Sequence, residues 1–175
     1  MSRFLGYPPE GQTTMNPASV AFSSHKPNTL LAILWGGTAC GVLDITAAFI
    51  VYGYFGLRPI RLLQGIAAGL LGPRSLEGGF ATAALGLLCH FVIAFGAATV
   101  YFAMSRGVRF LVDHAVLSGV LYGVAAYFFM NRIVVPLSAA RKYPFSFKMM
   151  VIGVVIHMFC VGLPISLSVR RYSIH

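Results

Sequence analysis

The chain has 175 residues, of which 58% are hydrophobic and only 10% are charged, and its formal net charge is +9. A water-soluble domain of this size uses roughly a quarter charged residues to cover its surface, so this composition excludes an ordinary soluble domain. The apolar residues stand in long blocks, and the mean hydropathy is +0.81, which is typical of an integral membrane protein.

In chain order, residues 1–28 are predicted to form a polar tail and residues 29–175 a transmembrane domain. Four apolar blocks in that domain are long enough to be helices that cross a hydrocarbon core of roughly 30 Å. The predicted spans are about 29–57, 80–105, 111–130 and 149–169. Asp113 must then lie at the membrane interface, at the start of the third span.

A shorter helix is predicted between the first two spans, over about residues 59–71. Pro59 suits a helix start, apolar residues recur at helical spacing, and Gly72-Pro73 ends the pattern. We interpret this segment as an amphipathic helix in the membrane interface. A re-entrant hairpin packed between the spans is the alternative.

The spans contain an internal similarity. "GVLDITAAF" (41–49) matches "GVLYGVAAY" (119–127), and "LGLLCHF" (85–91) matches "IGVVIHM" (152–158). The matched blocks follow the same order, so we expect an all-α four-helix bundle made of two similar hairpins in tandem. Asp44 falls opposite Tyr122 in this alignment, so the acid belongs to one half only.

Small residues are predicted to let the helices approach closely, because lipid removes the hydrophobic drive for association. The first and third spans each carry a GxxxG pair, formed by Gly37, Gly41, Gly119 and Gly123. We expect these glycines to pack helices together, and a self-association face is one possible use of them.

Asp44 is the only charged residue between Lys26 and Arg58. A charged Asp near the middle of a span costs about 3 kcal/mol, so we expect it to face the other helices and to be protonated or paired. The predicted intramembrane polar cluster consists of Asp44, His90, Tyr122 and His157.

Three uses of this cluster are open. It can fix helix packing through hydrogen bonds, and it can relay protons through Asp44 and His90. It can also bind a ligand or metal: His90 and His157 could hold haem b, and a transition metal could take His90 and His157 with Cys160, together with Cys40 and Asp44. Apart from these alternatives, we expect no cofactor and no bound metal.

The basic residues indicate the surroundings of the protein, since most of them end apolar blocks. They are Lys26, Arg58, Arg61, Arg106, Arg109, Arg132, Arg141, Lys142, Lys148, Arg170 and Arg171. This placement is typical of anchors that face anionic lipid headgroups in a bilayer. No basic patch is interleaved with aromatic residues, so nucleic acid is not an expected partner.

The segments "GIAAGLLG", "GLLCHF", "NRIVVPLS" and "HMFCVGLP", with an acid inside the first span, resemble small uncharacterised bacterial multi-pass membrane proteins. The resemblance implies a location in the bacterial cytoplasmic (inner) membrane and no established activity. Lys and Arg divide almost evenly between the two sides. Four spans place both termini on one side of the membrane, and we expect the cytoplasmic side, as is general for small bundles without a signal peptide.

No nucleophile with a base, zinc-protease motif or nucleotide-binding fingerprint occurs, so we expect no enzyme. The leading prediction is an accessory or interaction subunit that binds a membrane-complex partner or a second copy of itself. A small proton-linked transporter or channel that uses Asp44 and His90 is the first alternative, and haem or metal binding through His90 and His157 is the second.

Overall fold

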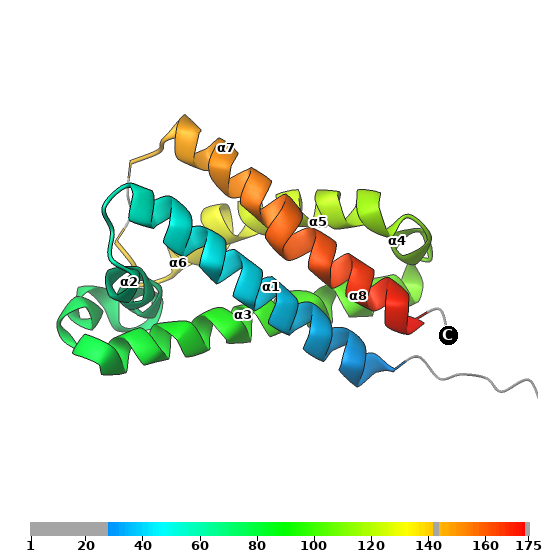
Figure 1. Ribbon diagram of the computed structural model, residues 1–175, viewed down its shortest axis with the longest axis horizontal. Helices are drawn as coiled ribbons and strands as arrows, with labels where there is room; N and C mark the ends of the chain where they lie inside the picture. The colour runs from blue at the N-terminus through cyan, green and yellow to red at the C-terminus, as the bar shows by residue number, and fades with distance from the viewer. Residues whose placement is uncertain (1–27, 142–143, 174–175) are drawn as a thin grey trace, which may run out of the picture.

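The computed structural model describes residues 28–141 and 144–173, and helices are the only regular secondary structure in this part of the chain (Figure 1). Four helical stretches are long and apolar enough to cross a membrane, which confirms the prediction of an all-α, multi-pass chain. They are Thr29–Tyr54, Gly79–Gly107, Ala115–Leu137 and Phe147–Ser173. The predicted polar tail lies outside the described residues, except for Asn28.

The first two long helices are α1 (Thr29–Tyr54) and α3 (Gly79–Gly107). Asn28 caps α1, since its side-chain oxygen accepts a hydrogen bond from the Leu31 N–H at 3.4 Å. The chain leaves α1 through Gly56, whose φ of 83° suits glycine.

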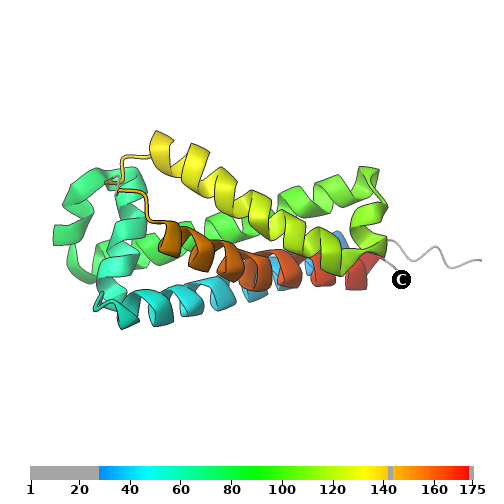
Figure 2. The same ribbon diagram turned by 90° about the horizontal axis from the view of Figure 1, so that it is seen from above.

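Between these helices, α2 (Pro59–Leu71) and the 3₁₀ segment η2 (Gly72–Glu77) form one folded unit. Ser75 Oγ donates to the Gln64 carbonyl at 2.9 Å, and Gln64 Nε2 donates to the Gly79 carbonyl at 2.9 Å. The unit runs crosswise to the long helices, as Figures 1 and 2 show. It packs closely on α3, where the Leu63 carbonyl occupies the space that a Cβ on Gly86 would need.

The third span differs from its predicted bounds of 111–130. Phe110–Asp113 forms a separate turn, α4, and the span begins at Ala115 with α5 (Ala115–Phe129). It then continues to Leu137 through η3 (Met130–Val134) and α6 (Val135–Leu137). The polar residues that follow Phe129 therefore lie on the helix and do not end it.

The fourth span consists of α7 (Phe147–Ile156), η4 (His157–Gly162) and α8 (Leu163–Ser173). Both η3 and η4 are π-helical turns, and each ends two residues before a proline, Pro136 or Pro164. Proline lacks an N–H and its ring collides with the carbonyl four residues earlier, so an α-helix cannot pass it without adjustment. The wider π turn accommodates both prolines within continuous helices.

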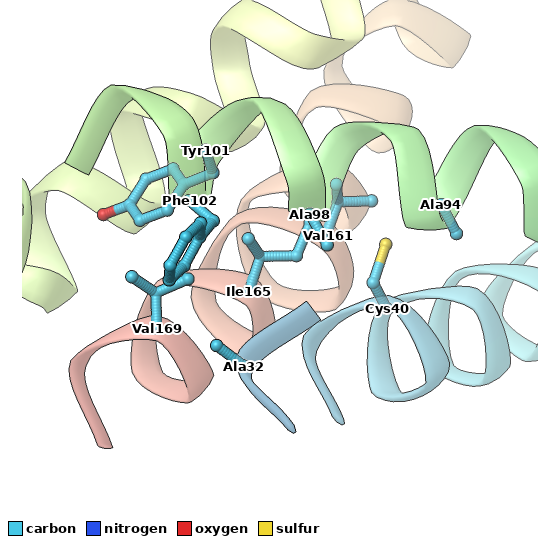
Figure 3. Packing of buried hydrophobic residues seen from close by; sticks show 9 residues of the cluster. All are labelled: Ala32, Cys40, Ala94, Ala98, Tyr101, Phe102, Val161, Ile165 and Val169. Carbon is cyan, nitrogen blue, oxygen red and sulfur yellow. The ribbon is translucent and has the colours of Figure 1, made fainter. Parts of the chain in front are cut away.

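In space, α1 packs against α3 on one side and against the fourth span on the other, and α5 packs against η4 and α8. Figure 3 shows the shared core, in which α1, α3 and the fourth span meet. Its buried members are Ala32, Cys40, Ala94, Ala98, Tyr101, Phe102, Val161, Ile165 and Val169.

The core occupies one end of the long helices. We call this the closed end: α1 up to Ile45, the second half of α3, the first half of α5, and α8. The other end, called the open end, comprises α1 beyond Ile45 together with η3, α6 and α7. None of the residues of η3, α6 and α7 is buried. The two ends differ in packing although both are apolar.

Candidate functional site

Asp44 and His157 face each other at the boundary between the closed and open ends. Asp44 lies on α1, and His157 is the first residue of the π turn η4. The Asp44 Oδ1 and His157 Nδ1 atoms are 3.9 Å apart, and the two side chains are 20% and 21% exposed. The structure therefore places the intramembrane acid beside a histidine and leaves the pair partly uncovered.

His157 is held by its own helix and by α5. Its Nδ1 lies 3.0 Å from the Gly153 carbonyl, which can only accept, so Nδ1 carries the hydrogen. The edge of the Tyr127 ring meets the imidazole with the centroids 5.3 Å apart. Tyr127 can reach this position because Gly153 has no side chain where the ring lies. These contacts fix the imidazole and leave Nε2 outside the hydrogen bond to Gly153.

The depth of the pair follows from its place on the helices. Asp44 lies ten residues before the end of α1 at Tyr54, and His157 lies ten residues after the start of α7 at Phe147. These two helix ends lie together, as Figure 1 shows, and the Lys148 ammonium stands 5.4 Å from the centroid of the Phe55 ring. Ten residues of helix rise about 15 Å, which is half of a roughly 30 Å hydrocarbon core.

His90 takes part in a different contact. Its Nε2 donates to the Gly41 carbonyl at 2.9 Å, so this imidazole ties α3 to α1. The neighbouring Phe91 ring lies where a Cβ on Gly41 would be, and the Phe95 ring lies where a Cβ on Gly37 would be. Within the described residues, His90 makes no hydrogen bond or ion pair with Asp44.

Tyr122 also lies apart from the Asp44–His157 pair. Its hydroxyl donates to the Ala97 carbonyl at 2.8 Å, and its ring meets Tyr101 edge to face with centroids 5.0 Å apart. The four residues of the predicted polar cluster thus make three separate interactions, and the structure pairs only Asp44 with His157. Depth along the helices was predictable, but the direction of each side chain around its helix was not.

The second glycine pair makes a helix contact as close as the one between Gly86 and α2. A Cβ on Gly123 would meet the backbone of His157 and Met158, and a Cβ on Gly162 would meet the backbone of Gly119 and Gly123. Backbone therefore touches backbone where α5 crosses η4, whereas Gly37 and Gly41 receive aromatic rings. The contact at Gly123 lies at the first two residues of the π turn, His157 and Met158.

Sequence reasoning missed a polar cluster in the closed end. The fully buried Tyr101 donates its hydroxyl to the Leu111 carbonyl at 2.9 Å and lies 2.8 Å from Ser118 Oγ. Ser118 Oγ lies 2.9 Å from the His114 carbonyl, so the cluster ties α3 to the turn before α5. The sequence does contain a pattern that indicates a buried Tyr101, since Ala94, Ala98 and Tyr101 share one helix face of mostly small residues.

Within residues 28–141 and 144–173, no three His, Cys, Asp or Glu side chains gather into a group that could hold a metal ion. Cys40, Cys89 and Cys160 are free thiols. Each of His90 and His157 keeps one ring nitrogen outside the hydrogen bonds described above. Binding of haem b through both residues therefore stays a prediction, which the absorbance of the purified protein near the Soret wavelength will test.

The chemistry open to this arrangement is limited and specific. A carboxylate and an imidazole can share or exchange a proton, and a partly exposed acid can accept a hydrogen bond from a neighbouring helix. No protein-family model, curated protein or solved structure matches the chain, so what this pair does must be inferred from its own geometry.

Proposed function

We propose that this chain is an interaction subunit of a bacterial cytoplasmic membrane, without catalytic activity, whose Asp44–His157 pair contacts a transmembrane partner. Its four spans form a bundle of two tandem hairpins with both termini in the cytoplasm, and α2 lies in the membrane interface. The observation that carries this proposal is that the pair, at mid-depth, keeps about a fifth of each side chain exposed.

The chain itself covers the Asp44–His157 pair only in part. A charged group at the bilayer centre costs a few kcal/mol when it faces lipid, so exposed intramembrane acids usually face protein or water. In this chain about a fifth of each side chain of the pair stays uncovered, and no residue of the adjoining α7 is buried. A polar helix from another chain would supply the missing hydrogen-bond partner and cover the apolar surface around it.

The tandem hairpins are supported by related contacts in the two halves, since in each a glycine of the first helix packs beside the histidine of the second. In the first, Gly41 packs against Phe91, next to His90. In the second, Gly123 packs against His157 and Met158, which match His90 and Phe91 in the sequence alignment. The glycine of the second half lies one helical turn later, because Gly41 aligns with Gly119. This offset places the two histidines in different surroundings.

Site-specific photocrosslinking in native membranes tests the proposed contact. Ala48 lies one turn after Asp44 on the same helix face, whereas Thr46 points away and is exposed. A crosslinker at position 48 is expected to give one discrete adduct whose yield falls at least severalfold in Asp44→Asn. The same crosslinker at position 46 is the matched control. Equal adducts at both positions, or none at position 48, would contradict the proposal.

A proton-linked transporter or channel is the alternative function. The facing of Asp44 and His157 favours it, because an acid next to an imidazole is a proton-exchanging pair. His157 then takes the role that sequence reasoning gave to His90. Proton flux into proteoliposomes should collapse in Asp44→Asn and persist in His90→Gln. Unchanged flux in Asp44→Asn would remove this alternative.

A further inference from the structure

A groove outside the Asp44–His157 site runs between the start of α5 and α8. Its lining residues are His114, Ala115, Val116, Leu117, Val120 and Arg170. Arg170 and His114 are the polar members, and the rest of the surface is apolar. The groove therefore has a cationic end at Arg170 and an apolar floor of alanine, valine and leucine side chains.

The groove lies at the membrane surface on the closed end. Arg170 stands three residues before the end of the fourth span at Ser173, so its Cα is about 4.5 Å from that helix end. Val120 lies six residues beyond His114, about 9 Å further into the membrane. The cationic end therefore stands at headgroup level, and the apolar floor reaches into the acyl-chain region.

The charges of this end favour an anion. Arg170 has no ion-pair partner among the described residues, Asp113 next to His114 in the sequence included. The N–H groups of Ala115, Val116 and Leu117 precede the first helical hydrogen bond of α5, which Ser118 makes to His114, and no side chain caps them. They add partial positive charge to that of Arg170.

We propose that this groove binds one anionic phospholipid, with the phosphate at Arg170 and His114 and one acyl chain along Val116 and Val120. Charge complementarity selects the headgroup, and the apolar floor selects a lipid over a soluble phosphate. Arginine is suited to phosphate because its planar fork can donate two hydrogen bonds. This site is independent of the partner contact proposed for Asp44.

Native mass spectrometry of the full chain, exchanged into detergent with phosphatidylglycerol or phosphatidylcholine, tests the proposal. The wild type is expected to retain one phosphatidylglycerol and to lose phosphatidylcholine. Arg170→Gln should weaken retention about fivefold, the factor for one arginine at an anionic surface. Arg171→Gln is the matched control, since Arg171 is adjacent in the chain and does not line the groove.

Two further arms separate the outcomes. Val116 is 58% exposed, so Val116→Trp fills the acyl floor without disturbing the core and should also reduce retention. Inorganic phosphate should fail to displace the lipid. Equal loss in Arg170→Gln and Arg171→Gln would indicate general surface attraction and overturn the site. Equal retention of both lipids, displacement by phosphate, or an unaffected Arg170→Gln would overturn it as well.

Discussion

The closed and open ends of this protein are built from similarly apolar sequence but are held together differently. In the closed end, glycine backbone contacts and buried hydroxyls lock α3, α5 and α8 around Tyr101 and Ile165. In the open end, α7 has no buried residue and meets its neighbours through side chains such as Tyr127. Apolar composition therefore makes helices, whereas small and hydroxyl-bearing residues decide where the helices close.

The Asp44–His157 pair lies where these two ends meet. One side of the pair is the rigid closed end, which fixes the positions of α1 and η4. The other side is the open end, where no residue of η3, α6 or α7 is buried. The comparison predicts that substitutions in the closed end change stability, whereas substitutions at the pair change function.

The largest effect is expected from a methyl group at Gly162. In Gly162→Ala the new Cβ meets the Gly119 carbonyl and the Gly123 nitrogen, so α5 must move away from the fourth span. We expect a loss of about 2–3 kcal/mol in the free energy of unfolding, measured as thermal unfolding in detergent. Gly53→Ala, in the open end of α1, is the control because nothing lies within 4 Å of its Cβ position.

Gly53→Ala should leave stability unchanged or raise it by up to about 1 kcal/mol, since alanine has less freedom than glycine in the unfolded chain. If Gly162→Ala were as stable as Gly53→Ala, backbone contact would not hold the closed end together.

A smaller effect is expected from Tyr101→Phe. The change removes a fully buried hydroxyl and leaves the Leu111 carbonyl and Ser118 Oγ with one partner fewer. The expected loss is about 1–2 kcal/mol, measured by the same unfolding experiment. Tyr54→Phe is the matched control in the open end, where Tyr54 is 85% exposed, and it should change stability by less than about 0.5 kcal/mol.

The smallest effect on stability is expected from Asp44→Asn. The pair is partly exposed and its atoms are 3.9 Å apart, so its loss should cost about 0–1 kcal/mol of unfolding free energy, the usual range for a polar contact between membrane helices. The same variant should strongly reduce the crosslinked adduct from position 48. A destabilisation as large as that of Tyr101→Phe would instead make the pair part of the packing and blur the distinction between the two ends.

Several features of the fold follow from the sequence alone. The four apolar blocks and the short helix over 59–71 are predictable because their lengths and the residues at their ends are local sequence features. For example, Pro59 begins α2, and Gly72 is its C-cap. The end of the third span could not be predicted from the sequence. A proline such as Pro136 usually ends a helix, but here a π turn precedes it and the helix continues to Leu137.

The candidate site was only partly predictable for a related reason. The position of a residue along an apolar block gives its depth, which is why Asp44, His90 and His157 could be grouped. The angle around the helix depends on close packing and on the π turn at His157, neither of which has a simple sequence pattern. Consequently His90 meets the Gly41 carbonyl and His157 meets the acid.

The π turn at His157–Gly162 divides the last span into two segments of unequal burial. After the turn, Ile165 and Val169 of α8 are fully buried, whereas α7 before the turn has no buried residue. His157 stands at the junction. Its backbone lies against Gly123, and the Gly153 carbonyl that accepts from its Nδ1 belongs to α7, so the imidazole beside Asp44 is tied to both segments.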